Sequence, residues 1–192
     1  IAMKYAGLSR PASGVEHYFS HIWDMRGLEF GTPVDFHGIQ CAVATLIAAR
    51  LYEKIKKTVP DREKAIKYAE SFDYGSWKNT LSGFLGKGAD AMTALEAKEH
   101  KYSVSAHKER IEKIISNWDK ILCIINEEIP PAEGIRSLLI KIGAPTNVEE
   151  IGLQSSLLPL TFKATKDIRD KYVLSRLCFD LGIIDEIEIE ED

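Results

Sequence analysis

Three histidines lie near the start of the chain with a spacing that suits chemistry. His17 and His21 are four residues apart, and His37 follows in the next predicted helix. On a helix, residues four apart share one face with their Cβ atoms about 5–6 Å from each other. Neutral imidazole binds zinc and other divalent transition metals. The spacing is therefore typical of a metal site, although two histidines on a solvated surface would have the same pattern.

Cys41 follows His37 by four residues and is expected on the same helix face. One interpretation adds it to the histidines as a rival His/His/His/Cys site. The other interpretation makes it a small buried residue of the helix core. A catalytic zinc usually has three protein ligands, and no carboxylate here has an evident ligand spacing. Glu16 directly precedes His17 and is expected to point elsewhere, so the ligand set remains incomplete.

The helix that carries His17 and His21 is predicted to begin at Ser13 and Gly14. Ser13 would act as its N-cap, and Glu16 would complete a capping box. The next helix is predicted over residues 34–55, because Pro33 precedes a run in which apolar residues recur every three or four positions. A turn through Gly27 and Gly31 would bring the two helix starts together.

Almost every other segment also has the pattern of a helix. Helices are predicted over residues 60–70, 74–84, 89–99, 105–128 with a break near Asn117, 132–142, 148–151, 155–164 and 167–181. Residues 185–189 alternate apolar and acidic side chains, which fits either a short edge strand or a frayed, solvated terminus. No repeat or linker divides the chain. The sequence predicts one all-α domain over residues 1–192.

The remaining histidines and the tryptophans are interpreted without a functional role. His100 and His107 lie in a polar stretch and are expected to face water. Trp23, Trp77 and Trp118 fall in separate predicted helices and are expected to anchor the core.

Composition restricts the class of protein. The 192 residues are 45% hydrophobic and 28% charged, with a net charge of −4, which is typical of a globular chain and disfavours nucleic acid as a partner. The apolar stretches are shorter than the roughly 18–20 residues that span a bilayer, so no membrane partner is expected. Three cysteines without paired spacing suit a reduced, cytoplasmic interior.

The first residues suggest a longer polypeptide. The chain begins with Ile1 and continues into a helix-like segment that Gly7 would terminate. We therefore expect this chain to be a part of a larger protein.

Four segments resemble the C-terminal helical domain of the sn-glycerol-1-phosphate dehydrogenase family. This family includes AraM-like enzymes and belongs to the superfamily of iron-containing alcohol dehydrogenases and dehydroquinate synthase-like proteins. The similar segments are 9–25 (SRPASGVEHYFSHIWDM), 36–53, 141–153 and 168–184. Residues 58–130 are similar only as generic helix.

The resemblance implies a multi-helical C-terminal domain of the dehydroquinate synthase-like fold. It also implies a separate N-terminal α/β domain that binds NAD(H) or NADP(H), with the cofactor-binding residues outside this chain. One divalent metal, zinc or nickel, would be held by an aspartate of that missing domain and by two histidines. By motif position these ligands are His17 and His37, while His21 would contact substrate.

The implied reaction is reduction of dihydroxyacetone phosphate to sn-glycerol 1-phosphate, by hydride transfer to a metal-polarised carbonyl. Ser9 and Arg10 are candidates for binding the substrate phosphate, although Arg10 before Pro11 is equally a structural loop residue. The full-length protein is expected to be a homo-oligomer, and the isolated chain is expected to be inactive.

Departures from the family pattern keep two alternatives open. Tyr18 stands where a second histidine is frequent, Ile39 stands where a glutamate is common, and residues 169–173 read RDKYV in place of RDRYT. A related polyol dehydrogenase, similar to glycerol dehydrogenase, is the first alternative. A non-catalytic helical interaction module is the second.

Overall fold

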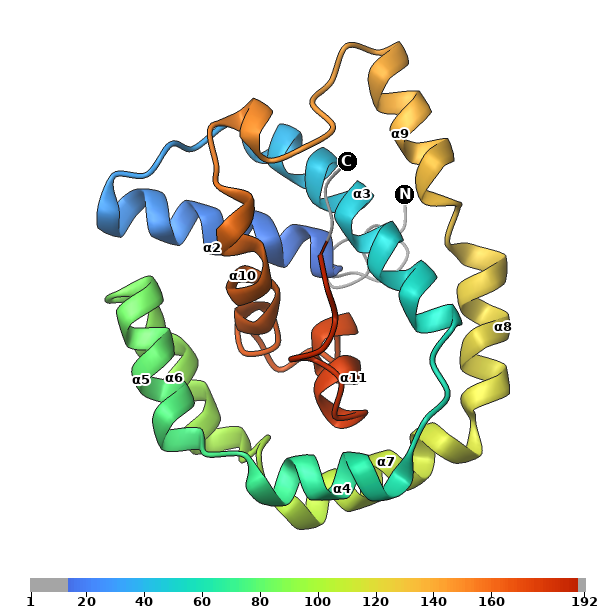
Figure 1. Ribbon diagram of the computed structural model, residues 1–192. Helices are drawn as coiled ribbons and strands as arrows, with labels where there is room; N and C mark the ends of the chain where they lie inside the picture. Colours follow the sequence, from blue (N-terminus) through green and yellow to red (C-terminus); the bar gives the residue numbers. More distant parts are fainter. Residues whose placement is uncertain (1–13, 190–192) are drawn as a thin grey trace, which may run out of the picture.

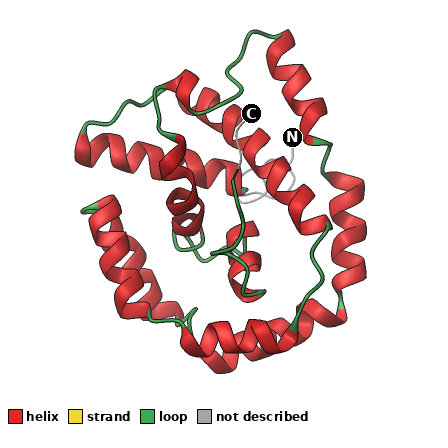
Figure 2. Cartoon of the chain, viewed as in Figure 1, coloured by secondary structure: helices red, strands yellow, loops and turns green. Residues whose placement is uncertain are grey.

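The computed structural model describes residues 14–189, and this part of the chain contains helices and no strand (Figure 2). The predicted all-α class is confirmed. The helices are α2 (Val15–Phe30), α3 (His37–Lys56), α4 (Arg62–Ser71), α5 (Tyr74–Leu85), α6 (Gly88–Glu99), α7 (Val104–Ser116), α8 (Trp118–Glu128), α9 (Ala132–Lys141), α10 (Leu158–Thr165) and α11 (Leu174–Asp180), with 3-10 turns η2 (Glu149–Ile151) and η3 (Ser155–Leu157).

The outer helices curve around a central pair. In Figure 1, the pair α5 and α6, the pair α4 and α7, then α8 and α9 form an arc around α10 and α11, while α2 and α3 cross on one side. The most extensive packing joins α2 to α3, and α10 also packs on α2. Phe19, Phe162 and Phe179 are completely buried between these elements, and the three tryptophans are buried as predicted. The α2–α3 pair is thus supported from within by the central helices.

Both ends of α2 follow from local chemistry. The Glu16 carboxylate accepts a hydrogen bond from the Gly14 backbone N–H at 3.0 Å, which is one half of the predicted capping box. Its other half was predicted at Ser13, which lies outside the described residues. The helix ends at Gly31, whose φ of 66° is left-handed, and the Gly31 N–H donates to the Gly27 carbonyl. Residues 31–36 then lead to α3 without helical structure.

The predicted helix over residues 167–181 is wrong in its first half. Only Leu174–Asp180 is helical, and residues 167–173 form turns and bends. The cause is tertiary, because the Asp167 carboxylate is buried and accepts hydrogen bonds from Trp77, Tyr102 and Arg176. These contacts outweigh the local helical pattern. The predicted break near Asn117 is confirmed by the boundary between α7 and α8.

The tail over residues 185–189 is neither a strand nor a frayed terminus. Ile187 and Ile189 are half-buried against the core. Asp185 lies 2.6 Å from the Lys163 ammonium, and Glu186 lies 2.6 Å from that of Lys64. The alternation of apolar and acidic residues therefore serves to anchor an irregular segment.

His107 does not face water, contrary to the sequence prediction. Its side chain is 1% exposed, and its Nδ1 lies 3.0 Å from Oδ1 of Asp180. Ile111 and Ile114 follow at helical spacing and are also buried, so His107 belongs to the inner stripe of α7. His100 is exposed as expected and ends α6 with a left-handed φ of 49°.

None of the helices within residues 14–189 combines the length and the apolar character needed to cross a membrane.

Candidate metal centre

The three histidines predicted from spacing lie together in the structure. The ring centroids of His17 and His21 are 4.5 Å apart, those of His17 and His37 are 4.7 Å apart, and those of His21 and His37 are 5.6 Å apart. His17 and His21 project from α2, and His37 is the first residue of α3. The turn at Gly31 and the return of residues 31–36 therefore unite the two helix starts, while Gly27 lies within α2.

A chain of hydrogen bonds determines which nitrogen of His37 carries its proton. The Gln40 amide nitrogen donates to Asp24 Oδ1 at 3.1 Å and to the Asp35 carbonyl at 2.8 Å, so Oε1 of Gln40 faces Ser20. The Ser20 hydroxyl donates its single proton to that oxygen at 2.8 Å. It must then accept from Nδ1 of His37, which lies 2.7 Å away.

In the neutral form of the ring, this arrangement places the lone pair of His37 on Nε2. Asp24 Oδ2, at 3.5 Å from Nδ1, favours the same tautomer. A partner on the other ring nitrogen is the usual support of a metal-binding histidine. Ser20 and Gln40 are fully buried, whereas the His37 ring is exposed. The interior of the α2–α3 pair thus orients a ligand nitrogen toward the surface.

Cys41 lies beside the histidines and is half-buried, so its interpretation as a buried core residue is wrong. Its Sγ lies 3.6 Å from Nε2 of His37. Within residues 14–189, His17, His37 and Cys41 form the one group of three such side chains whose ligand atoms all lie within 4.8 Å of one another. Burial raises the pKa of the Cys41 thiol, which keeps the sulfur protonated and able to donate to Nε2.

His21 lies at the edge of this group and stays neutral. Partial burial lowers its pKa, and repulsion from Arg169, and from His17 and His37 when these are protonated, lowers it further against the opposing effect of Asp24. Arg169 comes from the irregular segment after α10, at the far end of the sequence. The positive charge of Arg169 acts on His21 and also favours the approach of an anionic molecule to this edge of the site.

Several contributors to this site were not predicted from the sequence. Asp24 and Ser20 share the α2 face of His17 at helical spacing, and Gln40 shares the α3 face of His37. That periodicity was the available signal. Arg169 had no such signal, because a non-helical segment positions it. Ser9 and Arg10, the candidates for phosphate binding, lie outside the described residues.

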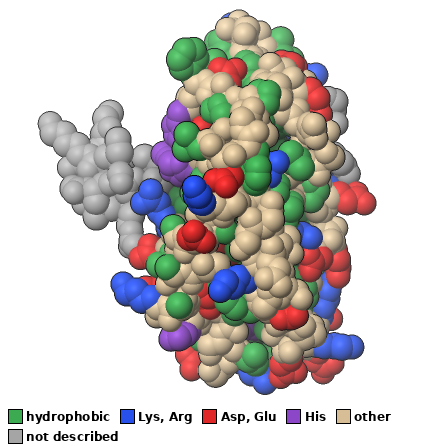
Figure 3. Space-filling model, turned by 90° about the vertical axis from the view of Figure 1, so that its left-hand side faces the viewer, with side chains coloured by type: hydrophobic (Ala, Val, Ile, Leu, Met, Phe, Trp, Pro, Cys, Tyr) green, Lys and Arg blue, Asp and Glu red, His purple; other side chains and the backbone are tan. Residues whose placement is uncertain are grey.

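The space-filling view shows histidine side chains at the surface in two separate places along one edge (Figure 3), in agreement with the exposure of His37 and His100.

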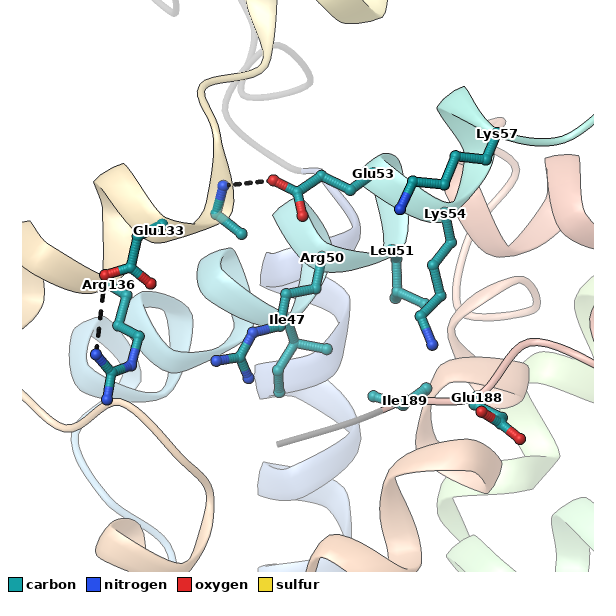
Figure 4. A pocket seen from close by; sticks show the side chains of 11 residues that line it. Ile47, Arg50, Leu51, Glu53, Lys54, Lys57, Glu133, Arg136, Glu188 and Ile189 are labelled. Carbon is teal, nitrogen blue, oxygen red and sulfur yellow. Dashed lines mark hydrogen bonds and ion pairs between the residues drawn. The ribbon is translucent and has the colours of Figure 1, made fainter. Parts of the chain in front are cut away.

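A cavity of about 310 Å³ lies elsewhere, between α3, α9 and the tail (Figure 4). Of its charged groups, Glu53 accepts a hydrogen bond from the Ala132 N–H that begins α9, and Glu133 pairs with Arg136. This cavity contains none of the predicted site residues.

Fold and site together describe a helical chain with a convergent set of histidine and cysteine donors. The chain is 26% identical to the NAD(P)+ glycerol-1-phosphate dehydrogenase of Halalkalibacterium halodurans, over 174 residues or 91% of its own length. It is 24% identical over 88% of its length to the enzyme of that name from Geobacillus stearothermophilus. A shorter match, 44% identical over 62 residues, covers 32% of the chain and 20% of the Korarchaeum cryptofilum enzyme of the same name.

The predicted resemblance is confirmed: this chain is related to the glycerol-1-phosphate dehydrogenases, with their C-terminal region as the matched part. The chain spans 33% of the length of the Halalkalibacterium and Geobacillus relatives. No family model matches the chain, and no solved structure matches it significantly.

Proposed function

We propose that this chain is the helical metal- and substrate-binding part of an NAD(P)-dependent glycerol-1-phosphate dehydrogenase. The enzyme would reduce dihydroxyacetone phosphate to sn-glycerol 1-phosphate in the cytoplasm. The observation that carries the proposal is the convergence of His17 and His37, with the Nε2 lone pair of His37 directed away from its buried hydrogen-bond partners. These residues fit a divalent metal such as zinc or nickel, since a neutral, oriented imidazole is a suitable ligand.

His17 and His37 would hold the ion, and a further domain of the same polypeptide would supply an aspartate ligand and the nicotinamide cofactor. When bound, the metal supplies Lewis acidity at the carbonyl oxygen of the substrate. Ser20 and Gln40 hold the His37 ring in the required tautomer. Domain arrangement and assembly into a homo-oligomer belong to this proposal.

His21 would contact the substrate. Its pKa is lowered, so at neutral pH the ring has one N–H to donate to a substrate oxygen and one free nitrogen. The positive charge of Arg169 nearby favours a phosphorylated substrate over an uncharged polyol. A phosphate and a carbonyl oxygen would thus meet different groups of the same site.

The alternative substrate class, a polyol of the glycerol-dehydrogenase type, was suggested by departures at Tyr18 and Ile39. Tyr18 is 1% exposed, and Ile39 packs against the core. Both departures therefore concern internal packing of α2 and α3, and they count little against a phosphorylated substrate. No specific observation favours the non-catalytic module.

The test uses the full-length polypeptide that contains this chain, with NADH or NADPH and either dihydroxyacetone phosphate or dihydroxyacetone. We expect a clear preference for the phosphorylated ketone. His37→Ala should lower kcat/KM at least about a hundredfold, because loss of a metal ligand removes several kcal/mol of transition-state stabilisation. His100→Asn is the matched control, since His100 is exposed and asparagine accepts its left-handed backbone. Wild-type activity and metal content in His37→Ala would contradict the proposal.

A further inference from the structure

Cys41 is placed where a metal ligand would lie. Its Sγ is 3.6 Å from Nε2 of His37. In a tetrahedral zinc site, with Zn–S about 2.3 Å and Zn–N about 2.0–2.1 Å, neighbouring sulfur and nitrogen ligands are separated by about 3.6 Å. The observed separation of Sγ and Nε2 therefore matches that of two ligands of one ion. The two residues are four apart, so one rigid helix sets the separation.

The second helix supplies the third donor. The α2 residue His17 has a ring nitrogen within 4.8 Å of both the His37 nitrogen and the Cys41 sulfur. The tight packing of α2 on α3 fixes this approach, and the buried Ser20–Gln40 pair lies directly beneath it. Three donors from two packed helices thus face one another in the described part of this chain.

We propose that Cys41 is a thiolate ligand, so that His17, His37 and Cys41 bind a divalent transition metal through this chain alone. The inference rests on the proposed function only in assigning a metal to this site. When the ion binds, a sulfur–metal bond forms and the thiol proton is released to solvent. A His₂Cys set leaves one tetrahedral position, which the aspartate of the proposed function would fill, so that a substrate oxygen would enter as a fifth ligand. The sulfur favours zinc, nickel or cobalt over magnesium and calcium.

The direct test is Co²⁺ titration of the reduced 192-residue chain, followed by absorption spectroscopy. Thiolate coordination produces a sulfur-to-cobalt charge-transfer band in the near ultraviolet, in addition to the visible d–d bands. We expect both in the unmodified chain. Cys41→Ser should abolish the charge-transfer band and weaken Co²⁺ binding at least about tenfold, because loss of a ligand costs no less than loss of a supporting contact. The same titration of the full-length polypeptide keeps the test valid if the shorter chain aggregates.

Cys123 provides the matched control. It is an exposed cysteine of α8, and its thiol donates to Glu127 at 3.1 Å, away from the histidines. Cys123→Ser should leave the charge-transfer band and the Co²⁺ affinity unchanged. In the unmodified protein, Zn²⁺ should slow alkylation of Cys41 by iodoacetamide and leave that of Cys123 unaffected, as measured by peptide mass spectrometry.

The outcomes separate this inference from the proposed function. Histidine-dependent d–d bands without a charge-transfer band, or a spectrum unchanged in Cys41→Ser, would overturn the thiolate ligand and leave the dehydrogenase proposal intact. Absence of Co²⁺ binding in both the chain and the full-length polypeptide would overturn the site altogether. A cysteine-dependent band in a full-length protein that does not reduce dihydroxyacetone phosphate would support the ligand and contradict the proposed function.

Discussion

Two histidine–aspartate contacts in this molecule have the same residue types and opposite surroundings. His37 Nδ1 lies 3.5 Å from Asp24, with side chains 45% and 35% exposed. His107 Nδ1 lies 3.0 Å from Asp180, with side chains 1% and 0% exposed. The Nε2 atom of His37 faces the sulfur of Cys41, whereas the His107 ring is enclosed against Phe179. Pairing with a carboxylate therefore does not by itself mark a functional histidine, and what the second nitrogen faces decides its role.

The enclosed contact belongs to a buried ionic region around Asp180 and Asp167. Arg110 donates to both Asp180 oxygens, at 2.8 and 3.0 Å. Asp167 pairs with Lys166 at 3.1 Å and with Arg176 at 3.0 Å. Burial alone would raise the pKa of Asp167, but the charges of Lys166 and Arg176 outweigh it and lower the pKa. This region holds the central helices in place, and the oxygens of its two carboxylates already accept hydrogen bonds from neighbouring side chains.

The largest effect should come from breaking that region. Asp167→Ala leaves two buried cations without their partner and should lower the free energy of unfolding by about 3–5 kcal/mol. Urea unfolding followed by circular dichroism measures it. Glu70→Ala is the control, because Glu70 pairs with Lys108 at 2.7 Å on the surface and should cost no more than about 1 kcal/mol. Similar losses in the two variants would contradict the structural role of the buried carboxylate.

The two histidines should then respond in opposite ways to truncation. His107→Ala opens a cavity in the core and should lower the free energy of unfolding by about 2–4 kcal/mol. His37→Ala removes a ring that is 45% exposed together with its hydrogen bond to Ser20, and should lower that free energy by no more than about 1 kcal/mol. Metal affinity should be lost in His37→Ala and retained in folded His107→Ala. Unfolding curves and metal titrations of both variants measure these effects. A larger stability loss in His37→Ala than in His107→Ala, or loss of metal binding only in His107→Ala, would contradict the roles given to the two histidines.

The sequence predicted the exposed region better than the enclosed one. The approach of His17 and His21 was predicted because helical spacing relates residues within one element and does not depend on the rest of the chain. The predicted turn between the two helices added His37. His107 was placed in water because its neighbours in sequence are polar, although its spacing to Ile111 and Ile114 indicated the inner face of α7. Periodicity was therefore a better guide than local composition.

Other features depend on contacts that no local pattern contains. The helical pattern of residues 167–173 is overridden by the buried bonds of Asp167 to Trp77 and Tyr102, which come from distant helices. Cys41 is half-buried in the folded chain. Spacing placed Cys41 next to His37 but did not decide whether that face was core or site.

A smaller effect should sharpen the account of the exposed site. Ser20→Ala removes the acceptor of the His37 Nδ1 proton, and the freed ring should bind metal about 10–100-fold more weakly. Competition with a chromophoric chelator measures the Zn²⁺ affinity. Thr45→Ala is a suitable control, because Thr45 is an exposed α3 residue whose hydroxyl bonds only to the Cys41 carbonyl among the contacts described. Equal Zn²⁺ affinities in Ser20→Ala and the unmodified chain would show that the hydrogen bonds from Gln40 through Ser20 do not orient the His37 ring.

The smallest effect is a dependence of stability on pH that belongs to the enclosed region. Burial alone would raise the pKa of Asp180, but contacts with His107 and Arg110 outweigh it and lower the pKa. A carboxylate with a lowered pKa in the folded state contributes stability above its unfolded pKa of about 3.9, and this contribution is lost as pH falls through the folded pKa. The contribution of one such group to the slope is at most about 1.4 kcal/mol per pH unit. Asp180→Asn should flatten the dependence of the unfolding free energy on pH below about 4. Urea unfolding of Asp180→Asn and of the unmodified chain at several pH values measures it, and equal slopes in the two proteins would mean that the buried His107–Asp180 contact adds no pH-dependent stability.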